Sequence, residues 1–304
     1  MSSPTPLSDP GHAPQGRSGG VRRITLDAAG ATLSGLLAEP EDRTPLAAVI
    51  ALHGGGMTAG YFDGQAGPGL SLLTLGARLG LTVLALDRPG YGDSARTFPE
   101  GQTLAEQSTT LHAALDAFAC RYETGGGLFL LAHSYGGKLA LTAAADDLRG
   151  RLLGVDVSGC GHRYAVTPEE LPGAHGRVDW RRSWGPLRLY PPGTFRFSQD
   201  LVAPMPARER AELLTWPRLF PEVAARIRVP VRLTFSEHES LWRHDDEALA
   251  ELRALFAAPK VVVERQSGAG HNISLGWTAR AYHLRALAFL QECLVAHETA
   301  AAPC

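Results

Sequence analysis

The residue with the clearest chemical potential is Ser134, which stands in the run F-L-L-A-H-S-Y-G-G at positions 129–137. An apolar stretch precedes this serine, and a stretch able to begin a helix follows it. The pattern predicts a sharp strand-to-helix turn that lifts the serine Oγ above the edge of a sheet. Such a turn leaves little room for side chains two positions before and two after the serine, and Ala132 and Gly136 meet that requirement. Small residues around a serine are also common in ordinary turns, so the assignment of Ser134 as a nucleophile depends on its partners.

A serine nucleophile needs a base to take its proton and a third group to hold that base in place. The third group is expected in the segment S-E-H-E-S, which directly follows an apolar run at 229–235. Its two carboxylates belong to Glu237 and Glu239. A loop at the carboxyl end of a parallel strand opens on the sheet edge where the nucleophile is expected, so either carboxylate is a candidate. The alternative for both is an ordinary solvated loop position.

The base is expected in the segment G-A-G-H-N at 268–272, which follows a β-prone run at 260–264. His271 is the candidate because this loop opens on the same edge of the sheet. Two other histidines adjoin the candidates, His133 before the nucleophile and His238 before the second carboxylate. Neighbouring residues on a strand or loop point apart, so we expect neither of them to reach the site.

The elements that must position these residues alternate along the chain. Two β-prone runs around Ala29 and Gly30 predict an antiparallel opening hairpin. The compact apolar runs that follow are typical of parallel strands covered on both faces, and helical patterns lie between them. This alternation predicts an α/β fold with a doubly wound, mostly parallel sheet of about eight strands. The hairpin is expected at 21–27 and 31–38, further strands at 46–53, 81–87, 127–132, 152–158, 229–235 and 260–264, and helices at 70–79, 103–121, 135–148, 245–257 and 278–297.

One long segment, residues 162–226, interrupts the alternation. It contains many prolines, several arginines and three of the five tryptophans, but no strand pattern. Because it follows the strand after the nucleophile helix, we expect it to lie over the carboxyl edge of the sheet as a lid, with a purely structural excursion as the alternative. The expected organisation is a disordered leader at 1–20, a core at 21–161 and 227–304, and the lid at 162–226.

Charge and composition exclude several kinds of partner. The formal net charge is −2 with both signs scattered along the chain, so no basic face indicates nucleic acid and no polybasic run indicates a membrane surface. Residues 1–20 are rich in Pro, Ser and Gly and lack an apolar core, which predicts a disordered leader rather than a signal peptide. No apolar run is long enough to span a bilayer. We therefore expect a cytoplasmic protein whose partner is a small molecule, in an oligomeric state that the sequence leaves open.

Cysteine usage and motif content indicate no metal and no cofactor. The four cysteines are isolated from one another, so they predict neither a zinc site nor a disulfide framework. No Walker A loop, metal-ligand spacing or dinucleotide fingerprint is present. Lysine occurs only at Lys138 and Lys260, whereas arginine is abundant, which is typical of a GC-rich bacterial genome.

Together these motifs resemble the α/β-hydrolase superfamily, and the resemblance covers about residues 21–297. The order of nucleophile, acid and histidine along the chain is the order that this family uses. The segment S-E-H-E-S-L-W resembles the family's G-x-x-D loop, which aligns Glu239 with the acid and leaves Glu237 as the alternative. Glutamate instead of aspartate is a departure from the family pattern, as is Ala132 instead of the first elbow glycine. A serine at the elbow distinguishes the chain from epoxide hydrolases and dehalogenases, which attack with aspartate.

The run H-G-G-G at 53–56 resembles the family's oxyanion loop, whose glycines let the backbone approach the substrate. Acyl transfer requires N–H groups directed at the developing oxyanion. The resemblance implies donors from Gly55 or Gly56 and from Tyr135, the residue after the nucleophile. Three consecutive glycines are equally able to form a flexible turn. The loop D-R-P-G-Y-G-D-S at 87–94 resembles another family segment, whose role is mostly structural.

The resemblance implies a serine hydrolase that cleaves a carboxylic ester or thioester through an acyl-enzyme, with Ser134 as nucleophile and His271 as base. The alternatives are an acyltransferase that uses the same Ser-His-Glu triad and a non-catalytic binding protein on the same fold. Arginines favour planar anions, and aromatic side chains provide apolar surface. We therefore expect Trp180, Trp184 and Arg181 of the lid to contact the substrate, whose acyl group then carries a carboxylate or belongs to a phosphopantetheine-type thioester. The alternative is that the arginines merely solvate the lid.

Overall fold

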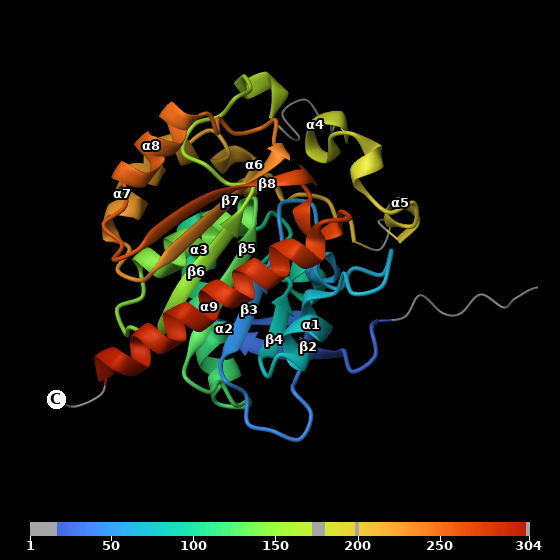
Figure 1. Ribbon diagram of the computed structural model, residues 1–304, viewed down its shortest axis with the longest axis vertical. Coiled ribbons are helices and arrows are strands. Elements are labelled where there is room, and N and C mark those ends of the chain that lie inside the picture. Colours follow the sequence, from blue (N-terminus) through green and yellow to red (C-terminus); the bar gives the residue numbers. More distant parts are fainter. Residues whose placement is uncertain (1–16, 172–179, 198–200, 302–304) are drawn as a thin grey trace, which may run out of the picture.

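An eight-stranded sheet forms the centre of the computed structural model, which describes residues 17–171, 180–197 and 201–301 (Figure 1). Its strands lie in the order β1-β2-β4-β3-β5-β6-β7-β8. The hairpin β1–β2 and the pair β2–β4 are antiparallel, and all other neighbours are parallel. The predicted α/β fold with a mostly parallel sheet is confirmed. The strands are β1 (Arg22–Ala28), β2 (Ala31–Ala38), β3 (Ala48–Leu52), β4 (Thr82–Leu86), β5 (Leu128–His133), β6 (Leu152–Ser158), β7 (Val231–His238) and β8 (Val261–Gly270).

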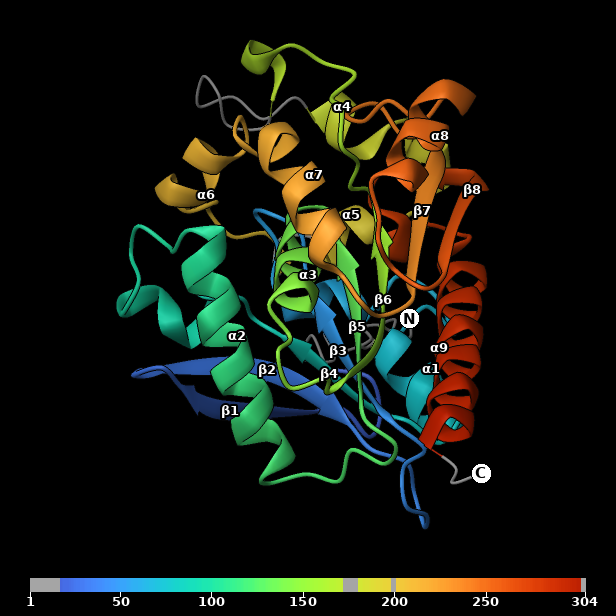
Figure 2. The ribbon, with the colours of Figure 1, turned by 90° about the vertical axis from the view of Figure 1, so that its left-hand side faces the viewer.

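Helices cover both faces of the sheet (Figure 2). The core helices are α1 (Leu72–Arg78), α2 (Leu104–Ala119), α3 (Tyr135–Ala145), α8 (Asp246–Ala254) and α9 (Ala279–Ala301). Figure 2 shows α2 and α3 on one face and α1 and α9 on the other. Side chains alternate between the two faces, so in β3 Ile50 packs on the α2 and α3 side while Val49 packs on the α1 and α9 side. This double burial explains the continuous apolar runs from which the strands were predicted.

Local signals begin two of the core helices where the sequence predicts them. α2 starts with a capping box, in which Thr103 Oγ1 accepts a hydrogen bond from the amide of Glu106 and Glu106 Oε2 accepts one from the amide of Thr103. α8 starts after Asp245, whose carboxylate accepts a hydrogen bond from the amide of Ala248. No helix within the described ranges is long and apolar enough to cross a membrane.

The segment between β6 and β7 lies beyond the carboxyl ends of the strands (Figure 2). It contains short helices that the sequence does not predict: η3 (Pro168–Glu170), α4 (Trp180–Trp184), η4 (Leu187–Leu189), α5 (Thr194–Phe197), α6 (Ala207–Glu212) and α7 (Trp216–Arg226). The last of them buries Trp216, Phe220, Val223 and Ala224 along one face, at helical spacing. Pro221 inside this helix hides the pattern, because proline normally breaks a helix. Hereafter residues 162–226 are named the insertion.

Strand β8 is longer than predicted. It extends from Val261 to Gly270, whereas the apolar run ends at Glu264, because β7 also continues and pairs with it as far as His238 opposite Gly270. The glycine-rich segment before His271 is therefore the end of a strand and not a loop. His271 consequently follows directly after the last residue of β8, at the edge of the sheet.

Candidate active site

Ser134 occupies the apex of the turn between β5 and α3. Its backbone has φ 53° and ψ −116°, a conformation that non-glycine residues rarely adopt and that persists only where the surroundings enforce it. The amide of Ser134 donates to the carbonyl of Ser158 (2.8 Å), which holds the apex against β6. A Cβ at Gly136 would lie 2.3 Å from the carbonyl oxygen of Leu52, so only glycine fits there. The methyl group of Ala132 is fully buried, and the departure from glycine at that position is accommodated.

His271 and Glu239 extend from Ser134 as a chain of two hydrogen bonds. His271 Nε2 lies 3.1 Å from Ser134 Oγ, and His271 Nδ1 lies 2.7 Å from Glu239 Oε2. The second carboxylate oxygen, Glu239 Oε1, accepts from the amide of Leu241 (2.9 Å). The carboxylate thus fixes the ring with its proton on Nδ1, which leaves Nε2 free to accept the serine proton.

The other candidate acid has a different partner. Glu237 is exposed, and its Oε2 accepts a hydrogen bond from the amide of Gly268 (2.7 Å). Glu239 is buried, and burial alone would raise its pKa, but the His271 ring and the Leu241 amide outweigh that effect and hold the pKa below its usual value. Of the two carboxylates left open by the sequence, the structure brings Glu239 to His271.

The expectation that His133 points away from the site is wrong. Its ring tilts against the ring of His271, with centroids 4.8 Å apart, and stacks on Tyr61 at the same distance. His133 Nδ1 also makes a hydrogen bond to Ser158 Oγ (3.1 Å). The alternation of side chains holds only within a strand, and the chain turns sharply at Ser134, so the two neighbours face a common space. Burial, and then the nearby His271, lower the pKa of His133 well below its usual value.

The three glycines of the run at 53–56 line the same cavity as Ser134. A Cβ at Gly55 would lie 2.0 Å from Met205 Cε, so the flexible Met205 side chain packs directly against the backbone of this loop. The amide of Gly56 is already engaged, because it donates to Tyr91 Oη (3.0 Å). In the part of the chain that the structure describes, the amides of Gly55 and Tyr135 have no protein acceptor, and these two remain available to an oxyanion.

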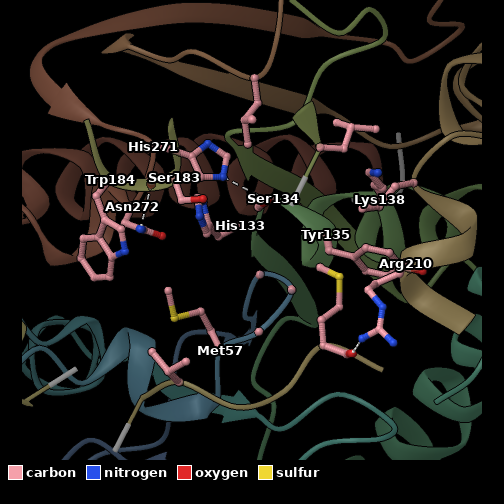
Figure 3. Close-up of a pocket in the computed structure, with 18 of the residues that line it drawn as sticks. Met57, His133, Ser134, Tyr135, Lys138, Ser183, Trp184, Arg210, His271 and Asn272 are labelled. Atoms are coloured by element: carbon pink, nitrogen blue, oxygen red, sulfur yellow. Dashed lines mark hydrogen bonds between the residues drawn. The ribbon is translucent and has the colours of Figure 1, made fainter. Parts of the chain in front are cut away.

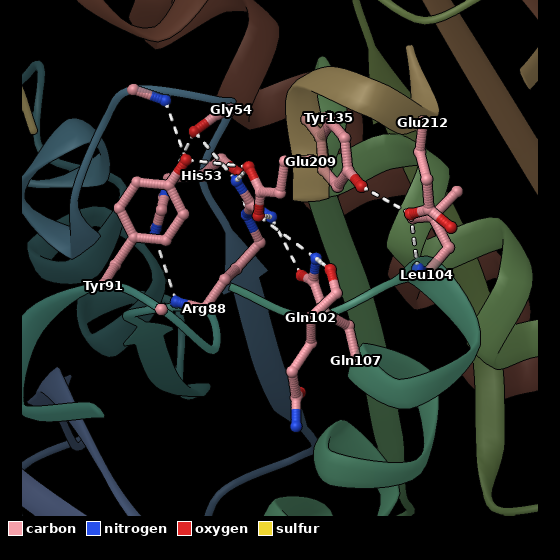
Figure 4. Close-up of polar contacts among 12 residues, drawn as sticks. His53, Gly54, Arg88, Tyr91, Gln102, Leu104, Gln107, Tyr135, Glu209 and Glu212 are labelled. Atoms are coloured by element: carbon pink, nitrogen blue, oxygen red, sulfur yellow. Dashed lines mark hydrogen bonds and ion pairs between the residues drawn. The ribbon is translucent and has the colours of Figure 1, made fainter. Parts of the chain in front are cut away.

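The buried Arg88 side chain is hydrogen-bonded to the loop at 53–56 (Figure 4). Arg88 Nε donates to the carbonyl of His53 (2.8 Å), and Arg88 Nη2 donates to the carbonyl of Gly54 (3.3 Å). Arg88 Nη1 and Nη2 also donate to the carboxylate of Glu209 in α6, and neither side chain is exposed. Gln107 Nε2 and Tyr91 Oη donate to the same carboxylate. One charged network therefore joins the loop at 53–56, the core and the insertion.

Ser134 opens into a cavity of about 730 Å³ (Figure 3). Its walls come from the sheet edge, from α3 and from the insertion, and they are mostly apolar. The core contributes Gly54, Gly55, Gly56, Met57, His133, Ser134, Tyr135, Lys138, Leu241, Trp242, His271 and Asn272, and the insertion contributes Tyr164, Leu171, Ser183, Trp184, Val202, Ala203, Pro204, Met205, Arg210 and Leu213.

The residues predicted to bind the substrate have different positions. Trp184 is buried and lines the cavity, where its ring packs against Tyr190 with centroids 5.2 Å apart. Trp180 and Arg181 open α4, and their side chains lie outside the described residues. Sequence reasoning missed Lys138, which lines the cavity from α3. The one signal in the sequence is its spacing of four residues from Ser134, which places it one helical turn further along α3. Within the described ranges, no group of three or more His, Cys, Asp or Glu side chains is arranged to hold a metal ion.

Comparisons with known proteins agree with this architecture. A sequence model of the alpha/beta hydrolase family matches residues 49–283, which is most of the chain. A highly thermostable carboxyl esterase from Bacillus coagulans has a similar structure, with a TM-score of 0.66 and 14% identity over 90% of this chain and 99% of that one. The epoxide hydrolase VrEH1 from Vigna radiata (TM-score 0.63, 14% identity, 91% and 99% covered) and a thioesterase domain from the curacin biosynthetic pathway (0.59, 16%, 88% and 99%) are also similar. Such identities show the fold alone, and no curated protein matches the chain.

Proposed function

The chain belongs to the alpha/beta hydrolase family, and we propose that it is a serine hydrolase that cleaves a carboxylic ester or thioester. The observation that carries the proposal is the pair of hydrogen bonds that joins Ser134 Oγ to His271 (3.1 Å) and His271 to Glu239 (2.7 Å). These contacts join residues that are far apart in the sequence at one sheet edge, in a geometry suited to proton transfer.

The proposed reaction has two halves. Ser134 Oγ attacks the acyl carbon while His271 Nε2 takes the serine proton, and the oxyanion accepts hydrogen bonds from the amides of Gly55 and Tyr135. His271 then gives the proton to the leaving alcohol or thiol, which departs and leaves an acyl-enzyme. Water enters, His271 takes one of its protons, and the resulting attack releases the acid and restores Ser134.

The insertion has the role of a lid in this proposal. Ten of the residues that line the cavity belong to it, so it separates the reacting carbonyl from bulk water. The fully buried pair of Arg88 and Glu209 anchors α6 to the core directly beneath the oxyanion loop. The position of the lid and the position of the oxyanion donors are therefore coupled.

A serine-directed fluorophosphonate probe tests the nucleophile. We expect it to label the wild-type protein but not Ser134→Ala, and we expect Ser134→Ala to lose at least about 10⁴-fold in kcat on p-nitrophenyl esters. Ser236→Ala is the matched control, because the buried Ser236 hydroxyl has no hydrogen-bond partner among the described residues. Labelling of Ser134→Ala at the wild-type rate would refute the proposal. Product analysis with and without an added alcohol distinguishes hydrolysis from acyl transfer.

A second pair of variants tests the acid. Glu239→Gln keeps the shape of the side chain but removes the charge that orients His271, so kcat should fall by about 10³- to 10⁴-fold. Glu237→Gln alters an exposed carboxylate that contacts only Gly268 among the described residues, and we expect less than about a threefold change. Steady-state kinetics on one ester measures both. Equal losses in the two variants would contradict the assignment of Glu239.

A further inference from the structure

Lys138 is a buried cation in the wall of the cavity that contains Ser134. It lies four residues after Ser134 on α3, which is about 6 Å along the helix axis, and only 2% of it is exposed. Figure 3 shows Lys138 and His271 on opposite sides of Ser134. The leaving group must receive its proton from His271 and so departs on that side. In the proposed reaction, the acyl chain then lies on the side of Lys138.

The ammonium group of Lys138 has few partners in the protein. Its Nζ donates to Tyr164 Oη (2.9 Å), which in turn donates to the carbonyl of Leu213 (2.9 Å). Within the described ranges, no carboxylate forms an ion pair with Lys138. An ammonium carries three N–H donors, so two of them have no protein acceptor in the part of the chain described. Four aromatic rings also surround Nζ, those of Tyr135, Tyr164, Trp216 and Trp242, whose centroids lie 5.4 to 5.8 Å from it.

The charges along the cavity wall have a single sign. The described residues that line the cavity include two permanent or near-permanent cations, Lys138 and Arg210, and no carboxylate. Glu239 lies behind His271, and Glu212 lies behind Tyr135, whose Oη donates to it (3.1 Å). Aromatic rings attract a cation but accept no strong hydrogen bond from it. The buried charge is therefore compensated only in part, at a residue that lines the cavity containing Ser134.

We infer that Lys138 binds a carboxylate on the substrate, so that the preferred substrates are esters or thioesters whose acyl chain ends in a carboxylate. This inference rests on the proposed function. One buried ammonium matches a single negative charge, and its two free N–H groups match the lone pairs of a carboxylate oxygen pair. The sequence had assigned an anion to the arginines of the insertion. Arg182 forms an ion pair with Glu170, and neither of these two residues lines the cavity. Arg210 does line the cavity, but its side chain is exposed and donates to the carbonyl of Met205.

A matched pair of substrates tests the inference. p-Nitrophenyl hydrogen glutarate and its methyl ester differ in the distal charge and in one methyl group. We expect the wild-type protein to prefer the hydrogen glutarate in kcat/KM, and Lys138→Met to reduce that preference by about 10- to 100-fold, mostly through KM. Lys260→Met is the control, because Lys260 is the one other lysine of the chain and its exposed ammonium pairs with Glu292. An unchanged preference in Lys138→Met, or a wild-type preference for the methyl ester, would overturn the inference.

A binding measurement keeps this test separate from the test of catalysis. Two lysines give two resonances after ¹³Cε labelling of lysine, and Lys260→Met assigns them. In a Ser134→Ala background, we expect monomethyl glutarate to raise the pKa of Lys138 by about one unit and dimethyl glutarate to leave it unchanged. If no ester is hydrolysed but this shift occurs, the proposed function fails and the inference on binding stands. A Lys138 resonance that does not respond to saturating monomethyl glutarate refutes the inference.

Discussion

Two buried cations, Arg88 and Lys138, pack against the ring of Tyr135, but they differ in how many protein groups accept their hydrogen bonds. Arg88 Cζ lies 4.8 Å from the ring centroid and Lys138 Nζ lies 5.4 Å from it. Arg88 faces the core, where a buried carboxylate, an amide side chain and two backbone carbonyls accept its N–H groups. Lys138 faces the cavity, where one phenol oxygen accepts a hydrogen bond from it. The two side chains are thus similarly buried, but protein acceptors compensate the charge of Arg88 much more fully than that of Lys138.

The difference separates a structural charge from a charge that serves a ligand. Burial lowers the pKa of both cations, but for Arg88 the carboxylate of Glu209 outweighs burial, and its pKa is raised. For Lys138 burial prevails and lowers the pKa to about 8. A buried charge with a complete set of partners stabilises a defined arrangement, whereas a buried charge without them costs stability that a bound anion recovers. Lost stability at a site of binding is a common consequence of function.

The largest effect on folding is expected from Arg88→Met. The change leaves Glu209 as a buried carboxylate without its cation, so the free energy of unfolding should fall by about 3–5 kcal/mol. Chemical denaturation at pH 7 measures this loss. Arg22→Met is the control, because Arg22 and Glu39 form an exposed ion pair and its removal should cost less than about 1 kcal/mol. Equal losses in the two variants would show that the buried network does not hold the insertion to the core.

Lys138→Met should change the free energy of unfolding in the opposite direction. It removes a buried charge that lacks a carboxylate and replaces it with an apolar side chain of similar length, at the loss of one hydrogen bond to Tyr164. We expect the free energy of unfolding to rise by about 1–2 kcal/mol at pH 7. The same denaturation experiment measures it. A loss as large as that of Arg88→Met would mean that Lys138 is a structural cation and would remove the contrast between the two.

The sequence predicts the parts of this site that depend on local pattern. Ser134, Glu239 and His271 each follow a strand whose apolar run is visible, and parallel strands bring their carboxyl ends to one edge. The register of the loop favours Glu239 over Glu237, but the contact itself depends on how far β7 and β8 continue beyond their apolar runs. His133 was misjudged for a related reason, since the turn at Ser134 ends the alternation of the strand.

Contacts that depend on the insertion could not be predicted. Arg88 and Glu209 are 121 residues apart, and no local signal distinguishes Glu209 from Glu212, the other acidic residue of the short helix α6. Lys138 is visible as one turn beyond the nucleophile, but its burial depends on Trp216 and Tyr164 of the insertion. The prolines of α7 concealed the helix that carries the first of these rings. Which core residue each side chain of the insertion contacts is therefore decided by the tertiary fold and not by local sequence.

The effect most specific to Lys138 concerns the dependence of stability on pH. Its pKa is about 8 in the folded protein against 10.5 for an ordinary lysine, so between these values the unfolded chain binds more protons. Stability must then rise with pH in this window, by at most about 1.4 kcal/mol per pH unit. The groups that face Lys138 are the buried Tyr135, Tyr164 and Cys160, the carboxylates of Glu209 and Glu212, which raise its pKa, and Arg88, which lowers it.

Because these neighbouring groups can also titrate, the quantity to measure is the difference in free energy of unfolding between the wild type and a lysine variant. Burial raises the pKa of the Cys160 thiol to about 12, and it raises the pKa values of Tyr135 and Tyr164 as well, so none of the three titrates ahead of Lys138. The difference in free energy of unfolding between the wild type and Lys138→Met should therefore rise from pH 8 to pH 10. The same difference for Lys260→Met should not change over this range, because the hydrogen bond to Glu292 raises the pKa of Lys260. A flat first difference would mean that Lys138 keeps an ordinary pKa, and that the ammonium already has in the folded protein the compensation that we assign to the substrate.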